Sequence, residues 1–77
     1  MQCTPKDNTA RILKSANPND TAPDWKEGYV GTGMGFVVKR TVNAETGKYF
    51  QGDLIGTRGG AIGRNLFILA QEWSCGS

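Results

Sequence analysis

The sequence predicts a mainly β protein: a small single-domain antiparallel meander that closes into an SH3-like or OB-like barrel, preceded by a short helix or an extended segment. The chain has 77 residues, which allows one domain with a thin core. Strand-forming residues alternate with turn signals from residue 25 onward. A unit of strand, glycine corner and strand occurs twice, at residues 29–40 and 54–65. Barrel closure would protect the edges of so small a sheet from aggregation.

The N-terminal segment, residues 1–24, begins with a signal for a short helix. Thr4 is a suitable N-cap, and Pro5 is a suitable first helical residue. A strand over residues 9–15 is the alternative, because the apolar residues there are too few to define a period. Residues 17–24 contain two prolines among several Asn and Asp residues, which disfavour regular structure. We therefore expect an exposed loop at residues 17–24.

The β core, residues 25–75, contains a predicted central hairpin. Strand formers at residues 36–42 and 49–50 are separated by a break at residues 43–47. The break fits a loop of about four or five residues, in which Gly47 adopts a left-handed conformation. The two glycine corners would then flank this hairpin.

The last stretch, residues 64–73, is compatible with either a helix or a strand. Its apolar residues fall at helical spacing, but the run at residues 66–69 is apolar all round, as in a strand that is covered on both sides. We favour the strand because it completes the barrel.

Aromatic side chains are the main core candidates in a chain that buries only about 60% of its unfolded surface. These candidates are Trp25, Phe36, Phe50, Phe67 and Trp73. We expect both tryptophans to be largely buried, at the two ends of the core.

The two copies of the repeated unit align residue by residue. Each contains a corner of the form Gly-Thr-x-x-Gly, preceded by an apolar residue. The aligned pairs include Gly31 with Gly56, Gly35 with Gly60, and basic Lys39 with Arg64. Because glycine readily adopts a positive φ, we expect at least one glycine of each pair to do so at its corner.

Cys3 and Cys75 lie near opposite ends of the chain. A disulfide between them would tie the termini together, whereas a chain without a recognisable leader more often holds two free or buried thiols. The missing leader favours a cytoplasmic location. The longest apolar run, at residues 66–70, is five residues, too short to cross a membrane, so we expect no membrane partner.

The residue types disfavour catalysis. The chain has no histidine, the ordinary general base near neutral pH and the commonest metal ligand. Two distant cysteines cannot form a structural zinc site, and the glycine corners lack the residues of a nucleotide-binding loop. We therefore predict no catalytic residue, no metal and no cofactor, and we favour a protein that is not an enzyme. Asp53, the one acid of interest in the repeat region, is expected to be a solvent-facing strand or turn residue.

The excess positive charge, +2 overall, lies between residues 39 and 64. It predicts a small binding protein that contacts nucleic acid or a phosphorylated ligand, with an aromatic ring stacking on bases. The predicted ligand-binding residues are Lys39, Arg40, Lys48, Tyr49, Arg58 and Arg64. For stacking, Tyr29 and Phe50 are alternatives to Tyr49.

A protein-interaction module is the alternative function. It would be an inhibitor, adaptor or assembly subunit of the kind that phages and mobile elements encode, and it would use a strand edge or the loop at residues 17–24. A core this thin also favours a homodimer over a monomer, because a second copy would bury further apolar surface.

Overall fold

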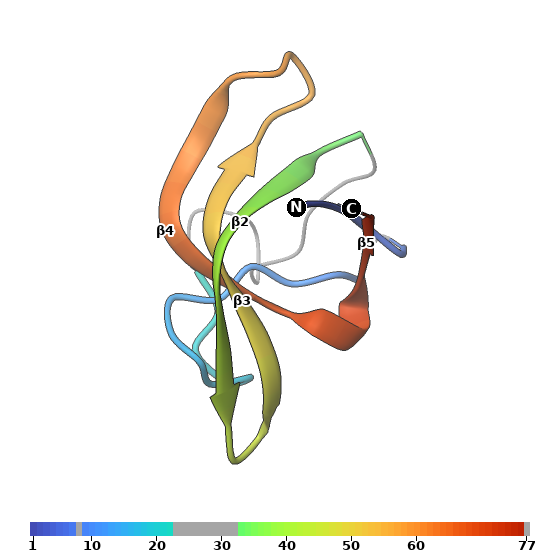
Figure 1. The fold of residues 1–77 in the computed structure, drawn as a ribbon. Coiled ribbons are helices and arrows are strands. Elements are labelled where there is room, and N and C mark those ends of the chain that lie inside the picture. Colours follow the sequence, from blue (N-terminus) through green and yellow to red (C-terminus); the bar gives the residue numbers. More distant parts are fainter. Residues whose placement is uncertain (8, 23–32, 77) are drawn as a thin grey trace.

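The fold is that of a computed structural model, which describes residues 1–7, 9–22 and 33–76. These residues form one antiparallel sheet of five strands in the order β4-β3-β2-β1-β5 (Figure 1). The strands are β1 (Gln2–Pro5), β2 (Gly35–Ala44), β3 (Gly47–Ile55), β4 (Ala61–Leu69) and β5 (Trp73–Gly76). The prediction of a mainly β meander is confirmed. The sheet does not close into a barrel, so the predicted closure is not observed.

The predicted central hairpin is confirmed, with a shorter loop than expected. Ala44 at the end of β2 pairs directly with Gly47 at the start of β3, so the turn consists of Glu45 and Thr46. Gly47 leaves the turn with a φ of 139°, a positive value that a side chain would disfavour. The hairpin projects at one end of the sheet, and the turn between β3 and β4 projects at the other (Figure 1).

The ambiguous stretch at residues 64–73 is a strand for most of its length. β4 continues to Leu69, where a short 3-10 turn, η2 (Ala70–Glu72), redirects the chain into β5. The strand is favoured because β4 is paired along β3, with Phe50 opposite Ile68 and Tyr49 opposite Leu69. These pairs bury the continuous apolar run on both faces of the sheet.

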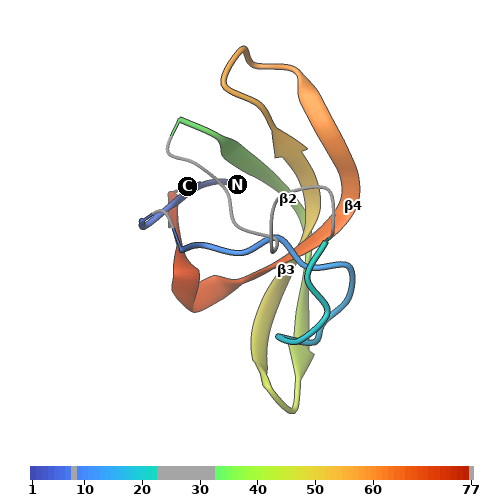
Figure 2. The same cartoon turned by 180° about the vertical axis from the view of Figure 1, so that it is seen from behind.

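The predicted helix at Thr4 is wrong, because this residue belongs to strand β1. Cys3 pairs with Phe36 of β2 on one side and with Cys75 of β5 on the other. The local helix signal therefore competes with backbone hydrogen bonds to two strands, and the sheet prevails. The two termini consequently lie side by side, as both views of the ribbon show (Figures 1 and 2).

The segment after β1 is mostly extended and reaches the far edge of the sheet. The backbone N–H of Leu13 donates to the carbonyl of Phe67 in β4 at 2.8 Å, and the Phe67 N–H donates back at 2.9 Å. Leu13 also bridges to Thr21, and Ala22 is buried. The part of the predicted exposed loop that the structure describes, residues 17–22, is therefore anchored at its end, while Asn17 and Asn19 are exposed. Residues 23 and 24 lie outside the described part.

Polar contacts secure this segment. The Arg11 guanidinium donates to both carboxylate oxygens of Glu72, with its closest contact at 2.8 Å, and also to the carbonyl of Pro18 at 2.7 Å. A hydrogen bond from the Ser15 hydroxyl, and secondarily the positive charge of Lys14, lower the pKa of Asp20. Arg11, Lys14 and Asp20 of this segment are thus engaged in ion pairs.

The core is divided between the two faces of the sheet. Neighbouring residues of a strand point to opposite faces. Phe50 and Ile68 belong to the larger buried cluster, whereas their neighbours Tyr49 and Leu69 belong to a smaller one. The face with the larger cluster, which includes Trp73, is called the core face below. Within the described residues, no helix is long and apolar enough to cross a membrane.

The aromatic core predictions hold where they can be checked. Phe36, Phe50 and Trp73 are buried, and Phe67 is half-buried against the smaller cluster. Trp25 lies outside the described residues.

The prediction that at least one glycine of each aligned pair has a positive φ is wrong for Gly35 and Gly60; Gly31, the partner of Gly56, lies outside the described residues, so for that pair it stays a prediction. Gly35, Gly56 and Gly60 do not have positive φ, whereas Gly33 (92°) and Gly59 (90°) do. These two glycines are not partners in the predicted alignment: Gly33 lies two positions before Gly35, and Gly59 lies one position before Gly60. Residues 29–32 lie outside the described part, so the duplication stays a prediction.

A close approach between β2 and β3 at Gly52 leads to the first testable prediction. A Cβ on this residue would overlap the carbonyl oxygen of Val37 and lie 3.1 Å from the backbone nitrogen of Lys39. Because the obstacle is backbone, we expect Gly52→Ala to destabilise the protein by about 3 kcal/mol. Gly60→Ala is the matched control, since a Cβ there meets nothing within 4 Å. Urea unfolding of the two variants would check this, and equal midpoints would contradict the close approach.

Candidate anion-binding face

A β-bulge in β2 reverses the direction of its side chains. Phe36 and Val38 pack in the larger cluster, but Val42 packs in the smaller cluster on the opposite face. The register shifts between Val38 and Arg40, with Lys39 as the extra residue. Regular alternation would have turned Arg40 toward the core face, and the bulge turns it away.

A second bulge occurs in β4. The register shifts between Gly52 and Leu54, so that Asp53 lies opposite two residues of β4, Arg64 and Asn65. Asn65 has a φ of 55°, a left-handed conformation that asparagine tolerates better than most residues. Without this bulge Arg64 would share the core face with Leu66. Instead its side chain lies beside Asp53.

The two bulges bring cations from both neighbouring strands to one carboxylate on β3. Lys39 Nζ lies 3.3 Å from Asp53 Oδ2, and Arg64 NH1 lies 3.9 Å from the same oxygen. The Asp53 side chain is only 13% exposed, whereas Lys39 and Arg64 are 52% and 74% exposed. The sheet face around Asp53 is called the Asp53 face below. Lys39 and Arg64, which align in the predicted duplication, occupy matching places on either side of β3.

Electrostatics leave this face positive. Arg40 is exposed and lies opposite Gln51, on the same face as Asp53 by strand alternation. The face therefore carries three cations and one carboxylate. Exposed ion pairs of this kind contribute only about 0 to 1 kcal/mol to stability.

The other predicted cations lie elsewhere. Lys48 is at the hairpin end, where its Nζ lies 5.4 Å from the ring centre of Phe50, a residue of the core face. Arg58 is exposed in the turn between β3 and β4. The five predicted basic residues thus do not form a single cluster: Lys39 and Arg64 meet at Asp53, and Arg40 lies on the same face.

The predicted stacking residues are not available on this face. Tyr49 is fully buried, and its hydroxyl lies 2.6 Å from the hydroxyl of Thr46. Phe50 is 6% exposed, and Tyr29 lies outside the described residues. Tyr49 packs against Leu13 and Leu69 in the smaller cluster. Tyr49 is therefore a core residue in this structure.

Asp53 belongs to the site but is not among the binding residues that the sequence predicted. It was expected to face solvent, yet its side chain is only 13% exposed and lies within ion-pair distance of two cations. Its position opposite the bulges depends on how β2, β3 and β4 pair. A local sequence pattern does not predict the register of that pairing.

No cluster of three or more His, Cys, Asp or Glu side chains that could hold a metal ion is found in the described part of the chain. On the Asp53 face, Lys39 and Arg64 lie within ion-pair distance of one carboxylate. Searches of protein-family models, curated proteins and solved structures found no match to this chain.

Proposed function

We propose that the protein is a non-enzymatic binding module whose Asp53 face takes a phosphate-bearing ligand. The observation that supports this is the convergence of Lys39 and Arg64 on Asp53, with Arg40 on the same face. A phosphate group would replace solvent around three cations, two of which lie within ion-pair distance of Asp53. Charge-assisted hydrogen bonds of this kind are shorter and stronger than neutral ones.

The ligand is recognised through its phosphates and not through stacked bases. Both aromatic side chains near the predicted site, Tyr49 and Phe50, are buried. A nucleic-acid backbone or a phosphorylated small molecule satisfies the same chemistry. The affinity for a nucleic acid would therefore depend little on sequence and strongly on salt.

The disulfide changes the compartment that we propose. Cys3 and Cys75 are joined across β1 and β5. Because such bonds persist mainly in oxidising surroundings, we propose an oxidising compartment in place of the cytoplasm. We also propose that the sheet is an open form of the predicted SH3-like or OB-like barrel, with Leu13 at the outer edge of β4 as its partial closure.

A charge-reversal experiment tests the proposed function. The site variant is Arg40→Glu with Arg64→Glu, and the control variant is Lys6→Glu with Lys48→Glu. All four residues are exposed, and the two variants have the same net charge. We expect the site variant to lose about tenfold or more in affinity for a labelled mixed-sequence oligonucleotide, because it loses fixed phosphate contacts. The control should lose much less.

Fluorescence anisotropy at low and moderate salt, together with tripolyphosphate as a competitor, provides the measurement. Competition by tripolyphosphate would identify phosphate as the recognised group. Equal losses in the two variants would show that only net charge matters. Failure of the wild-type protein to bind at low salt, where electrostatic attraction is strongest, would end the proposal.

A further inference from the structure

We propose that the ligand of the Asp53 face is a small phosphate ester, whose uncharged organic part lies in a groove beside this face. The groove is formed mainly by β1 and the start of β2 and is called the β1–β2 groove below. This inference rests on the proposed function. It decides between the two ligands that the proposed function allows, in favour of the phosphorylated small molecule.

The β1–β2 groove has the size of a small-molecule site. Its volume is about 650 Å³, within the range of about 300 to 1,000 Å³ that is typical of ligand pockets. It lies near the points marked N and C in Figure 1, where β1, β2 and β5 adjoin. A groove of this size suits a compact ligand better than a nucleic-acid chain, which needs a positive track along its backbone.

Strand register places the β1–β2 groove next to Asp53. Val37 of β2 is paired with Asp53 of β3 on one side and with Gln2 of β1 on the other. Residues that are paired directly across strands point to the same face, so Gln2, Val37 and Asp53 form one row across the sheet. Neighbouring strands are about 4.8 Å apart, which puts the two ends of this row about 10 Å apart. A ligand whose phosphate contacts Lys39 therefore reaches the groove with its organic part.

The groove is on the side of the sheet opposite the core face. Cys3 and Phe36 also line it, but each is 1% exposed and packs in the larger cluster. Because neighbouring residues of a strand point to opposite faces, Gln2, Thr4 and Val37 point away from that cluster. The accessible wall of the groove is thus continuous with the Asp53 face.

This wall combines apolar surface with hydrogen-bonding groups. Val37 and Ile55 are half-buried and supply the apolar surface. Gln2, Thr4 and Ser74 are exposed and supply an amide and hydroxyl groups. All five side chains are uncharged, so they complement an uncharged group, while the cations beside Asp53 complement the phosphate. The organic part contacts aliphatic side chains here, which is consistent with the burial of Tyr49 and Phe50.

A ligand series tests the proposal on the disulfide-intact protein. Inorganic phosphate, ribose 5-phosphate and AMP share an anionic group and differ in the size of the uncharged part. We expect affinity to rise in this order, with AMP about tenfold or more tighter than inorganic phosphate, because apolar burial and hydrogen bonds add to the phosphate contact. In NMR titrations, all three ligands should shift the amide signals of Lys39 and Asp53. Only the two esters should shift those of Thr4 and Ser74.

Variants separate the groove from the Asp53 face. Thr4→Phe fills the groove and should lower the affinity for AMP to that for inorganic phosphate, while the affinity for inorganic phosphate stays unchanged. Thr41→Phe is the matched control, because Thr41 is also an exposed strand threonine but lies in β2 toward the hairpin, away from the groove. Gln2→Ala removes the amide without adding volume and should weaken AMP severalfold. Circular dichroism checks that each variant is folded.

The outcomes distinguish this inference from the proposed function. Equal affinities of the wild-type protein for AMP and inorganic phosphate would overturn the inference and leave phosphate binding intact. AMP binding that neither Thr4→Phe nor Gln2→Ala weakens would also overturn it. If no phosphate compound binds at low salt, the inference and the proposed function both fail.

Discussion

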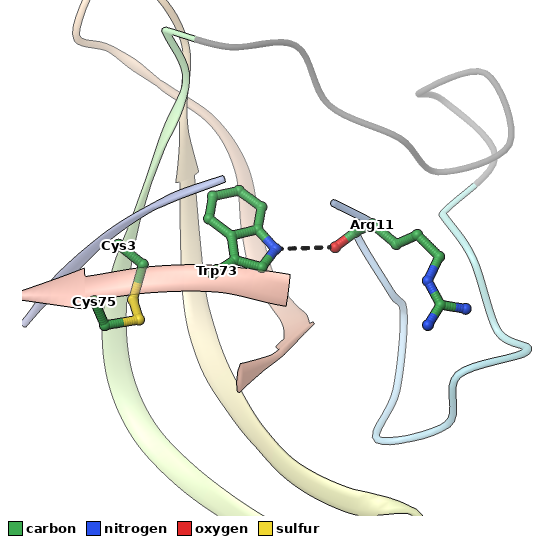
Figure 3. Close-up of a disulfide and its surroundings, with 4 residues drawn as sticks. All are labelled: Cys3, Arg11, Trp73 and Cys75. Atoms are coloured by element: carbon green, nitrogen blue, oxygen red, sulfur yellow. Dashed lines mark hydrogen bonds between the residues drawn. A yellow bond between two sulfur atoms is a disulfide. The ribbon is translucent and has the colours of Figure 1, made fainter. Parts of the chain in front are cut away.

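Replacing Trp73 with alanine is expected to destabilise the protein by about 3 to 5 kcal/mol, a large share of the stability of so small a domain. The Trp73 side chain is 2% exposed, and its ring centre lies 5.9 Å from that of Phe36. Its indole N–H donates to the carbonyl of Arg11 at 3.4 Å (Figure 3). The substitution therefore leaves a cavity and also removes an anchor of the segment that follows β1.

Urea unfolding monitored by circular dichroism measures this loss. Trp73→Phe is the first control: it keeps an aromatic ring in the core but removes the indole donor, and should cost about 1 to 2 kcal/mol. Ile62→Ala is the second control, because this apolar side chain is half exposed, and it should change stability by no more than about 0.5 kcal/mol. In a Trp25→Phe background, iodide should quench Trp73 poorly; ready quenching would contradict its burial.

Removing the disulfide is expected to cost about 4 kcal/mol. Cys3 and Cys75 are separated by 72 positions, so the bond closes almost the whole chain into a loop. In the chain-entropy description, a cross-link of this span restricts the unfolded state by about that amount. It also joins β1 to β5, the short edge strand that carries Trp73 (Figure 3).

The test compares the wild-type protein with Cys3→Ser/Cys75→Ser, each with and without reductant. Reductant should lower the unfolding midpoint of the wild-type protein to near that of the double variant, and should leave the double variant unchanged. Thiol titration of the untreated wild-type protein should find no reactive group. An identical midpoint for oxidised and reduced wild-type protein, with two thiols titrated after reduction, would contradict the expected stabilisation.

The homodimer stays a prediction. Burial of Ile62 against a second copy would add apolar surface to a thin core, but the exposed arginines beside it oppose self-pairing at β4. Light scattering of the oxidised protein measures the state directly, and the oxidised form is the one to use because it is the form in which β5 is tied to β1.

Local sequence patterns determined much of the sheet. The alternation of strand formers and turn residues predicted the β2–β3 hairpin, the strand at β4 and the buried positions of Phe36 and Trp73. These features depend on residues that are close together in the chain. Gly47 favours a turn, and the apolar runs favour strands whose side chains are buried. The charge distribution likewise predicted that Lys39, Arg40 and Arg64 belong to the positive part of the surface.

Only the tertiary structure decided which face each side chain occupies. Because side chains alternate with a period of two, one extra residue at Lys39 reverses every later position of β2, and one at the Asn65 bulge does the same in β4. Asp53 thereby gained two cations, and packing against Leu13 and Leu69 made Tyr49 part of the core. The predicted helix at Thr4 does not form because β1 pairs with β2 and β5. These strands are far away in the chain, and their backbone hydrogen bonds with β1 outweigh a local helix cap. The disulfide likewise depends on the tertiary structure, since only the pairing of β1 with β5 brings Cys3 next to Cys75.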